Sequence, residues 1–275
     1  MSEAPDSEDF RTPLQRFGAD VRTVRLGRNL TQKHLGKAAG YTESYVSQVE
    51  SGKLSPSAAF AAGCDKAFGT NGLFALMRQR MEEGDHPQQF MPYVQLERTA
   101  SGILGFATTT VIGLLQTPEY AHAIFRAGHP SVPEEVIHEK VTARIKRREI
   151  LDQDRPPALW AVLHEACMRA HVGGSAVMAE QLAYILRAAE RPGIDVQVVP
   201  NSAGEAGVHS APFTLLTFDG EPSILYTEDP QGGRVCRVAP VVEAWMRQYE
   251  RLMAHARPPG ESLAIIDTIR KEYLS

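Results

Sequence analysis

The sequence is poor in the features that would place it outside the ordinary globular class. Its three cysteines, Cys64, Cys167 and Cys236, lie far apart, which argues against a disulfide framework or a zinc knuckle. It has no run of about 18 apolar residues, so we expect no membrane-spanning helix. The segment MSEAPDSEDFRTP lacks the apolar stretch of a signal peptide. These absences favour a protein of the reducing cytoplasm with no role in a membrane.

Motifs for catalysis and metal binding are also missing. The segment LHEACMRAH contains His164 and His171, but a zincin needs two histidines four residues apart. We therefore expect these histidines to be ordinary core or surface residues and not zinc ligands. The glycine-rich NSAGEAGVHSA lacks the ending of a phosphate-binding loop, and no Gly-x-Ser-x-Gly elbow is present. We therefore predict that the chain is not an enzyme and that it holds no metal or cofactor.

Charge is unevenly distributed along the chain. The formal net charge of -4 argues by itself against nucleic acid as a partner. Residues 11–55, however, contain eight basic and three acidic residues, a net charge of +5, whereas residues 1–10 carry -4. A basic module between an acidic tail and an acidic body is expected where one part of a chain meets phosphate groups.

Residues 13–82 are predicted to form five helices. Thr31 and Thr42 are suited to cap the second and third helices, and Gly40 to make the turn between them. Pro56 is expected to begin the fourth helix, because proline suits the first helical position. The fifth helix is expected to fade into the polar RQRMEEGDHPQQ. We predict a disordered tail over residues 1–12, a helical domain over 13–82 and a linker over 83–89.

Residues 31–52, TQKHLGKAAGYTESYVSQVESG, have the pattern of a helix-turn-helix. Leu35, Val46 and Val49 are apolar where two short helices must share a core. Gly36 is small where the helices cross, and Gly40 tolerates the positive φ of a turn. The outer face of the second helix is polar, as expected of a helix that enters the major groove of DNA.

The pattern of the sequence changes from all-helical to mixed at about residue 90. Strand and helix patterns alternate there, which predicts an α+β domain over residues 90–275. The expected strands are 103–115, 159–164, 195–199, 213–218 and 224–226. The expected helices are 117–127, 133–152, 176–189, 241–254 and 261–274. Trp245, Tyr249 and Leu252 make a helical stripe that is expected to be core.

The segment VRTVRLGRNLTQKHLGKAAGYTESYVSQVESGKLSPS resembles the repressor-like helix-turn-helix of Xre-type regulators. The resemblance implies that Arg25 pairs with Glu50, tying the first helix to the third. It implies that Gln32 caps the second helix and touches the phosphate backbone. The residues implied to reach the bases are Glu43, Ser44 and Gln48. Glu43 departs from the neutral or basic residue of many relatives, although a carboxylate can accept from the amino group of cytosine.

Each of these residues has an alternative interpretation. Arg25 and Glu50 are better explained as a structural pair than as DNA contacts. Gln48 is either a base contact or a solvated side chain, with its helical face favouring contact. Tyr45 either stacks on the DNA backbone or packs on the domain. The expected contacts with the DNA backbone are Gln32, Lys33, Tyr45, Ser47 and Lys53.

The remainder of the chain resembles the C-terminal domain of WhiJ-like actinobacterial regulators. The matching segments are LLQTPEYAHAIFRAG, RREILDQDRPPALWAVLHEACMR, VGGSAVMAEQLAYILRAAERPGIDVQVVPNSAG and PFTLLTFDGEPSILYTED. The stretch ILGFATTTVIG departs from the aromatic, acidic and proline-glycine residues of many relatives. The resemblance implies a domain that binds a small acidic partner protein, a ligand or another copy of the chain.

Two functions follow from these patterns. The leading one is a sequence-specific DNA-binding transcriptional regulator that acts on double-stranded DNA as a homodimer, because one helix reads only a few base pairs. The alternative is an antitoxin-like or anti-regulator module that acts with a small partner encoded nearby.

Overall fold

The computed structural model of the chain describes residues 12–83, 90–205, 211–229 and 232–275. It divides into two compact units, residues 1–85 together with 130–143, and residues 86–129 together with 144–275. The acidic tail predicted for residues 1–12 lies outside the described residues except at its last position. Thr12 is buried, and its hydroxyl accepts a hydrogen bond from the backbone N–H of Gln15, so it caps a helix.

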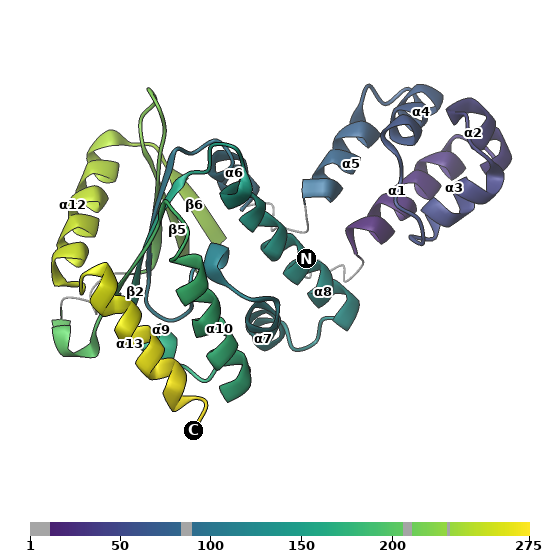
Figure 1. The fold of residues 1–275 in the computed structure, drawn as a ribbon. Helices are drawn as coiled ribbons and strands as arrows, with labels where there is room; N and C mark the ends of the chain where they lie inside the picture. Colours follow the sequence, from purple (N-terminus) through teal and green to yellow (C-terminus); the bar gives the residue numbers. More distant parts are fainter. Residues whose placement is uncertain (1–11, 84–89, 206–210, 230–231) are drawn as a thin grey trace, which may run out of the picture. The chain divides into compact units, whose positions relative to one another are not determined.

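The first unit is helical, as predicted (Figure 1). Each of the first four helices begins after a threonine or serine whose hydroxyl accepts from a backbone N–H three residues on. The fourth helix does not begin at Pro56, because Ser57 supplies the cap one residue later. The helices are α1 Pro13–Gly27, α2 Gln32–Ala39, α3 Glu43–Glu50, α4 Ala58–Phe68 and α5 Leu73–Glu83.

Apolar side chains from all of these helices form the core of the first unit. Leu35, Val46 and Val49 are fully buried there, as the sequence predicts. Two glycines allow the helices to approach closely. A Cβ at Gly18 would lie 2.3 Å from the carbonyl oxygen of Val49, and one at Gly36 would lie 2.7 Å from that of Tyr41. The packing therefore depends on these small residues as much as on the apolar ones.

The second unit is built on one six-stranded sheet with strand order β3-β2-β1-β4-β5-β6. β1, β2 and β3 are parallel, whereas β4, β5 and β6 join them in antiparallel pairs. Together with its helices this sheet confirms the predicted α+β class. The strands are β1 Gly102–Ala107, β2 Ala158–His164, β3 Ile194–Val199, β4 Phe213–Thr217, β5 Ile224–Asp229 and β6 Gly232–Cys236.

Helices cover both faces of this sheet. Side chains alternate along β1, so that Ile103 packs with α10 and α13 in one core, and Phe106 packs with α12 in the other. Tyr249 and Leu252 of α12 are buried in the second core, as predicted. The α-helices are α6 Met91–Glu97, α7 Pro118–Gly128, α9 Glu165–Arg169, α10 Ser175–Ala188, α12 Ala239–His255 and α13 Pro259–Glu272. The 3-10 helices are η1 Gly113–Leu115, η2 Arg147–Asp152 and η3 Asn201–Ala203.

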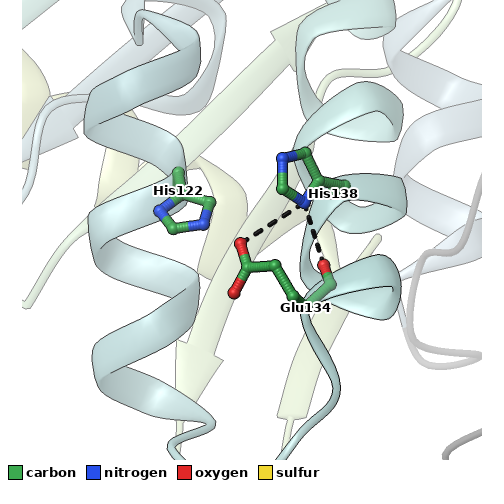
Figure 2. A group of neighbouring side chains, drawn as sticks. All are labelled: His122, Glu134 and His138. Atoms are coloured by element: carbon green, nitrogen blue, oxygen red, sulfur yellow. Dashed lines mark hydrogen bonds and ion pairs between the residues drawn. The ribbon is translucent and has the colours of Figure 1, made fainter.

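Helix α8, Glu134–Lys146, contains residues of both units and is strongly charged. Figure 2 shows its pair of Glu134 and His138, drawn together with His122 of α7. The Nδ1 atom of His138 lies 3.3 Å from the Glu134 carboxylate and 3.0 Å from the Glu134 carbonyl oxygen. Both side chains are exposed, so their interaction contributes little to stability. No helix among the described residues is both long and apolar enough to span a membrane.

Two predicted elements end earlier than their sequence patterns suggest. The strand expected over residues 103–115 stops at Ala107, because buried side chains hold the rest as a loop. The backbone N–H of Val111 donates to the Tyr120 hydroxyl, and the Gln116 amide donates to the carbonyl of Val111. The helix expected over residues 133–152 tightens into η2 from Arg147. Strand β6 and the short helices α6 and α9 were not predicted.

Candidate nucleic-acid interface

Helices α2 and α3 form the helix-turn-helix. The Thr31 hydroxyl accepts from the backbone N–H of His34, and the Thr42 hydroxyl accepts from that of Tyr45. Between them Gly40 has a φ of 80°, the left-handed conformation that glycine adopts without strain. These local features set where each helix begins and how the chain turns between them.

The two sides of α3 differ sharply in exposure. Val46 and Val49 have no exposed surface, and they hold the helix on the core. The residues on the opposite side are exposed: Glu43, Ser44, Ser47 and Gln48. The Gln48 amide lies 3.5 Å from the Ser44 hydroxyl, at the limit of a hydrogen bond. The structure thus brings the predicted base-contacting residues together on one accessible face.

Arg25 and Glu50 form a buried ion pair between α1 and α3. The guanidinium donates through Nε and Nη2 to the two carboxylate oxygens, at 2.5 and 2.9 Å, and only 8% and 3% of the two side chains is exposed. Arg25 also donates to the Leu30 carbonyl at 2.7 Å. The hydrogen bond with Glu50 raises the pKa of Arg25 above its ordinary value. This geometry fits the structural role expected of the pair.

Gln32 is part of the same polar cluster. Its amide donates to the Glu50 carboxylate at 2.8 Å, so the side chain joins α2 to α3. It does not cap α2, because Thr31 occupies the cap position and makes the capping hydrogen bond. Gln32 remains partly exposed.

Tyr45 packs within the domain while part of its ring stays exposed. Its ring centroid lies 4.4 Å from that of Tyr41 and 5.1 Å from that of Phe60. Its hydroxyl accepts from the backbone N–H of Ser57 at 2.9 Å. The packing alternative for Tyr45 is therefore present in the structure, and its hydroxyl already has a partner.

Exposed basic residues lie on several segments of the helix-turn-helix unit. Lys33 and Lys37 extend from α2, and Arg28 follows α1. Lys53 lies in the turn after α3, where its backbone N–H donates to the carbonyl of Gln48 at 2.9 Å. Of the basic residues counted between positions 11 and 55, Arg25 is committed to a buried ion pair, while these four are exposed to solvent.

Asp65 supports the domain in a way that the sequence pattern does not reveal. It is buried on α4 and accepts hydrogen bonds from the Thr70 hydroxyl and from the backbone N–H groups of Phe74 and Ala75 at the start of α5. Burial alone would raise the pKa of Asp65, but these hydrogen bonds lower it below its ordinary value. An aspartate followed by a Gly-Thr-Asn-Gly turn is a weak signal that could have suggested this role.

Comparisons with known families cover most of the chain. Residues 16–74 match a family described as a helix-turn-helix domain. Residues 90–268 match a family described as a domain of unknown function, DUF5753. No curated protein and no solved structure was found to match the chain. Because more than half of its residues match the second family, the chain belongs to the family of proteins with the DUF5753 domain, and it bears a helix-turn-helix domain before it.

Proposed function

We propose that this protein is a sequence-specific DNA-binding transcriptional regulator of the Xre type. Residues 13–82 are the DNA-binding domain, and residues 90–275 sense a partner protein or ligand or mediate dimerisation. The linker expected over residues 83–89 lies outside the described residues except for Glu83, which is the last residue of α5. We also propose that it acts in the cytoplasm as a homodimer, and that its second domain is of the WhiJ-like actinobacterial kind. The helix-turn-helix family match supports DNA binding rather than catalysis as the main activity.

The observation that carries the proposal is the two-sided character of α3. Its buried side is fixed by Val46, Val49 and the Arg25–Glu50 pair, so the helix is rigidly presented. Its other side offers an amide, hydroxyls and a carboxylate to solvent. Amides and hydroxyls on a fixed helix are the groups that read base edges in the major groove. Glu43, Ser44, Ser47 and Gln48 are all exposed, so burial in the described part of the domain does not require them to be polar.

The test begins by selecting bound sequences from random double-stranded DNA with the purified full chain. The affinity of the selected site is then compared for the parent and for Gln48→Ala. We expect the variant to bind the site about 10- to 100-fold more weakly, the cost of losing a bidentate amide–base contact. Binding to random DNA should change little, because the lysine contacts with phosphate remain.

Gln95→Ala is the matched control. Gln95 is an exposed glutamine on α6, in the other unit. Its loss should leave both affinities unchanged. If selection yields no preferred sequence, the proposed function is wrong. If a preferred sequence emerges and Gln48→Ala binds it as tightly as the parent, DNA reading survives but the role of Gln48 does not.

A further inference from the structure

The second unit contains a cavity of about 150 Å³ at one end of its sheet. The strand register brings three chain segments together there. Phe106, near the end of β1, pairs with Phe213 at the start of β4, which pairs in turn with Thr227 near the end of β5. The loop after β1 and helix α6 complete the walls. In open α/β sheets, ligands often bind beyond the carboxyl ends of parallel strands, and this cavity lies beyond the carboxyl end of β1.

Two arginines line this cavity, and they differ in how their charges are balanced. Arg147 donates through Nε and Nη2 to the two oxygens of Glu97, at 2.8 and 2.7 Å, in a buried bidentate pair. Tyr93 donates to the same carboxylate at 2.7 Å. The Glu97 carboxylate therefore already accepts three hydrogen bonds, and it acts on the second arginine, Arg144, through its charge without bonding to it.

Arg144 lacks such a partner. Its Nη1 donates to the side-chain oxygen of Gln116 at 2.9 Å, but its Nε is buried and no described residue accepts a hydrogen bond from it. Among the described residues no carboxylate lies within ion-pair distance of Arg144. Burial and the neighbouring Arg147 lower the pKa of Arg144 to about 10, although the charges of Glu228 and Glu97 oppose this shift. The guanidinium of Arg144 also lies over the Phe125 ring, 4.8 Å from its centroid, but no carboxylate among the described residues neutralises its charge, so an anion in the cavity could do so.

The cavity also offers apolar surface. Its floor includes Gly105, in the middle of β1, where a Cβ would meet only Ile112, at 3.5 Å or more. The rings of Phe90, Tyr93 and Tyr226 pack on one another beside it, with centroids 4.1 to 5.5 Å apart. A ligand that occupied this space would meet a hydrophobic wall next to the arginine.

The polar side of the cavity is held rigidly. Gln116 is buried, and its amide nitrogen donates to the Val111 carbonyl while its oxygen receives Arg144. Gln181 of α10 bonds to the backbone of Leu115 and Thr117 on either side of it. The loop that presents Gln116 is therefore fixed by buried side chains, as preorganised binding sites require.

We propose that this cavity binds a small organic monocarboxylate, whose charge Arg144 receives and whose apolar part lies over Gly105 against the aromatic side chains. A carboxylate fits the planar donor edge of a guanidinium. A single negative charge fits better than a phosphate, because Glu97 and Glu228 also line the cavity and would repel a dianion. That this ligand acts as an effector of DNA binding rests on the proposed function, whereas its binding in the cavity does not.

The test measures binding to the full chain without DNA, so its failure leaves the proposed reading of DNA untouched. Benzoate and 3-methylbutanoate are titrated by calorimetry, each beside its neutral amide. We expect at least one acid to bind about 10- to 100-fold more tightly than its amide, as loss of charge-assisted hydrogen bonds dictates. Arg144→Gln should remove this preference, and Arg144→Lys should restore part of it.

Two further variants separate binding from folding. Gly105→Val keeps every charge but fills the floor of the cavity, and it should abolish binding of the acid. Arg187→Gln removes an exposed arginine of α10 that pairs with Glu180, and it should bind like the parent. The proposal is overturned if the amides bind as well as the acids, if Arg144→Gln keeps the preference, or if neither acid binds at about 10 mM.

Discussion

Removal of the Glu50 carboxylate should destabilise the first unit strongly. In Glu50→Ala the Arg25 guanidinium loses both of its short hydrogen bonds to the carboxylate, and Gln32 loses its acceptor. Arg25 keeps its bond to the Leu30 carbonyl, but its charge stays largely buried without an opposing charge. The cost of the substitution is therefore chiefly that of an uncompensated buried cation.

The expected loss is about 3–5 kcal/mol, the range found when one partner of a buried ion pair is removed. A small domain is stable by about 5–15 kcal/mol in total, so this loss is between about a fifth and the whole of its stability. The double variant Arg25→Met with Glu50→Leu should behave differently. It leaves no unpaired charge, and its stability should lie within about 1 kcal/mol of the parent or above it.

Urea unfolding of the full chain can resolve this effect, because Trp160 and Trp245 both lie in the second unit. Tryptophan fluorescence then follows the second unit, while circular dichroism follows the helices of both. Glu50→Ala should move the unfolding of the first unit, seen by circular dichroism alone, to lower urea. The transition seen by fluorescence should not move. Glu180→Ala, which breaks an ion pair with more than half of each side chain exposed, is the control and should cost less than about 1 kcal/mol.

The result that refutes this reasoning is a small effect of the single substitution. The low exposure of the pair indicates that both charges are desolvated. If Glu50→Ala costs less than about 1 kcal/mol, that interpretation is wrong. A double variant as unstable as the single one would show instead that shape, and not charge, accounts for the loss. DNA binding gives an independent check, since a structural pair can be replaced by apolar residues without loss of the reading face.

Asp65 should make the first unit sensitive to acid. The pKa of Asp65 is lowered in the folded state, so its contribution to stability is present above its ordinary pKa near 3.8 and is lost as pH falls through the folded value. Asp65→Asn should therefore be less stable than the parent at pH 6 and should lose less stability between pH 6 and pH 3. If the stability of both proteins falls equally with pH, this reasoning is contradicted. DNA affinity should fall steeply with salt, and Lys53→Ala should reduce the slope of log affinity against log salt by about 1. The control Lys271→Ala, in α13, should leave this slope unchanged. An unchanged slope for Lys53→Ala would show that Lys53 makes no phosphate contact.

The helix-turn-helix could be predicted in detail because its determinants are local. Thr31, Gly40 and Thr42 act within a few residues of their own positions, through caps and a turn. Leu35, Val46 and Val49 meet across a single tight turn, so their spacing alone indicates a shared core. The close approach of Gly18 to α3 could not be predicted, because it depends on where α1 crosses α3, and the sequence of neither helix determines that crossing point.

The strand β1 shows where such local reasoning fails. The run of threonine, valine and isoleucine after Ala107 has the composition of a strand, yet it forms a loop and η1. Its backbone is bonded instead by Gln116, at the end of the same segment, and by Tyr120 and Gln181, from later parts of the chain. Strand propensity describes a fit to a pleated surface, and here buried polar side chains offer the backbone better partners than another strand would.

The same loop explains why the cavity could not be predicted. Arg144 and Arg147 lie in a charged segment whose pattern indicates a solvated helix, and Glu97 lies about 50 residues earlier. Only the folded sheet brings these groups to one place and gives Arg147, but not Arg144, a carboxylate. The asymmetry is what distinguishes a binding site from a structural ion pair. If both arginines were paired with carboxylates, the cavity would be a stabilising contact with space beside it. Because no carboxylate among the described residues pairs with Arg144, the protein retains a partly buried charge that an anionic ligand can neutralise.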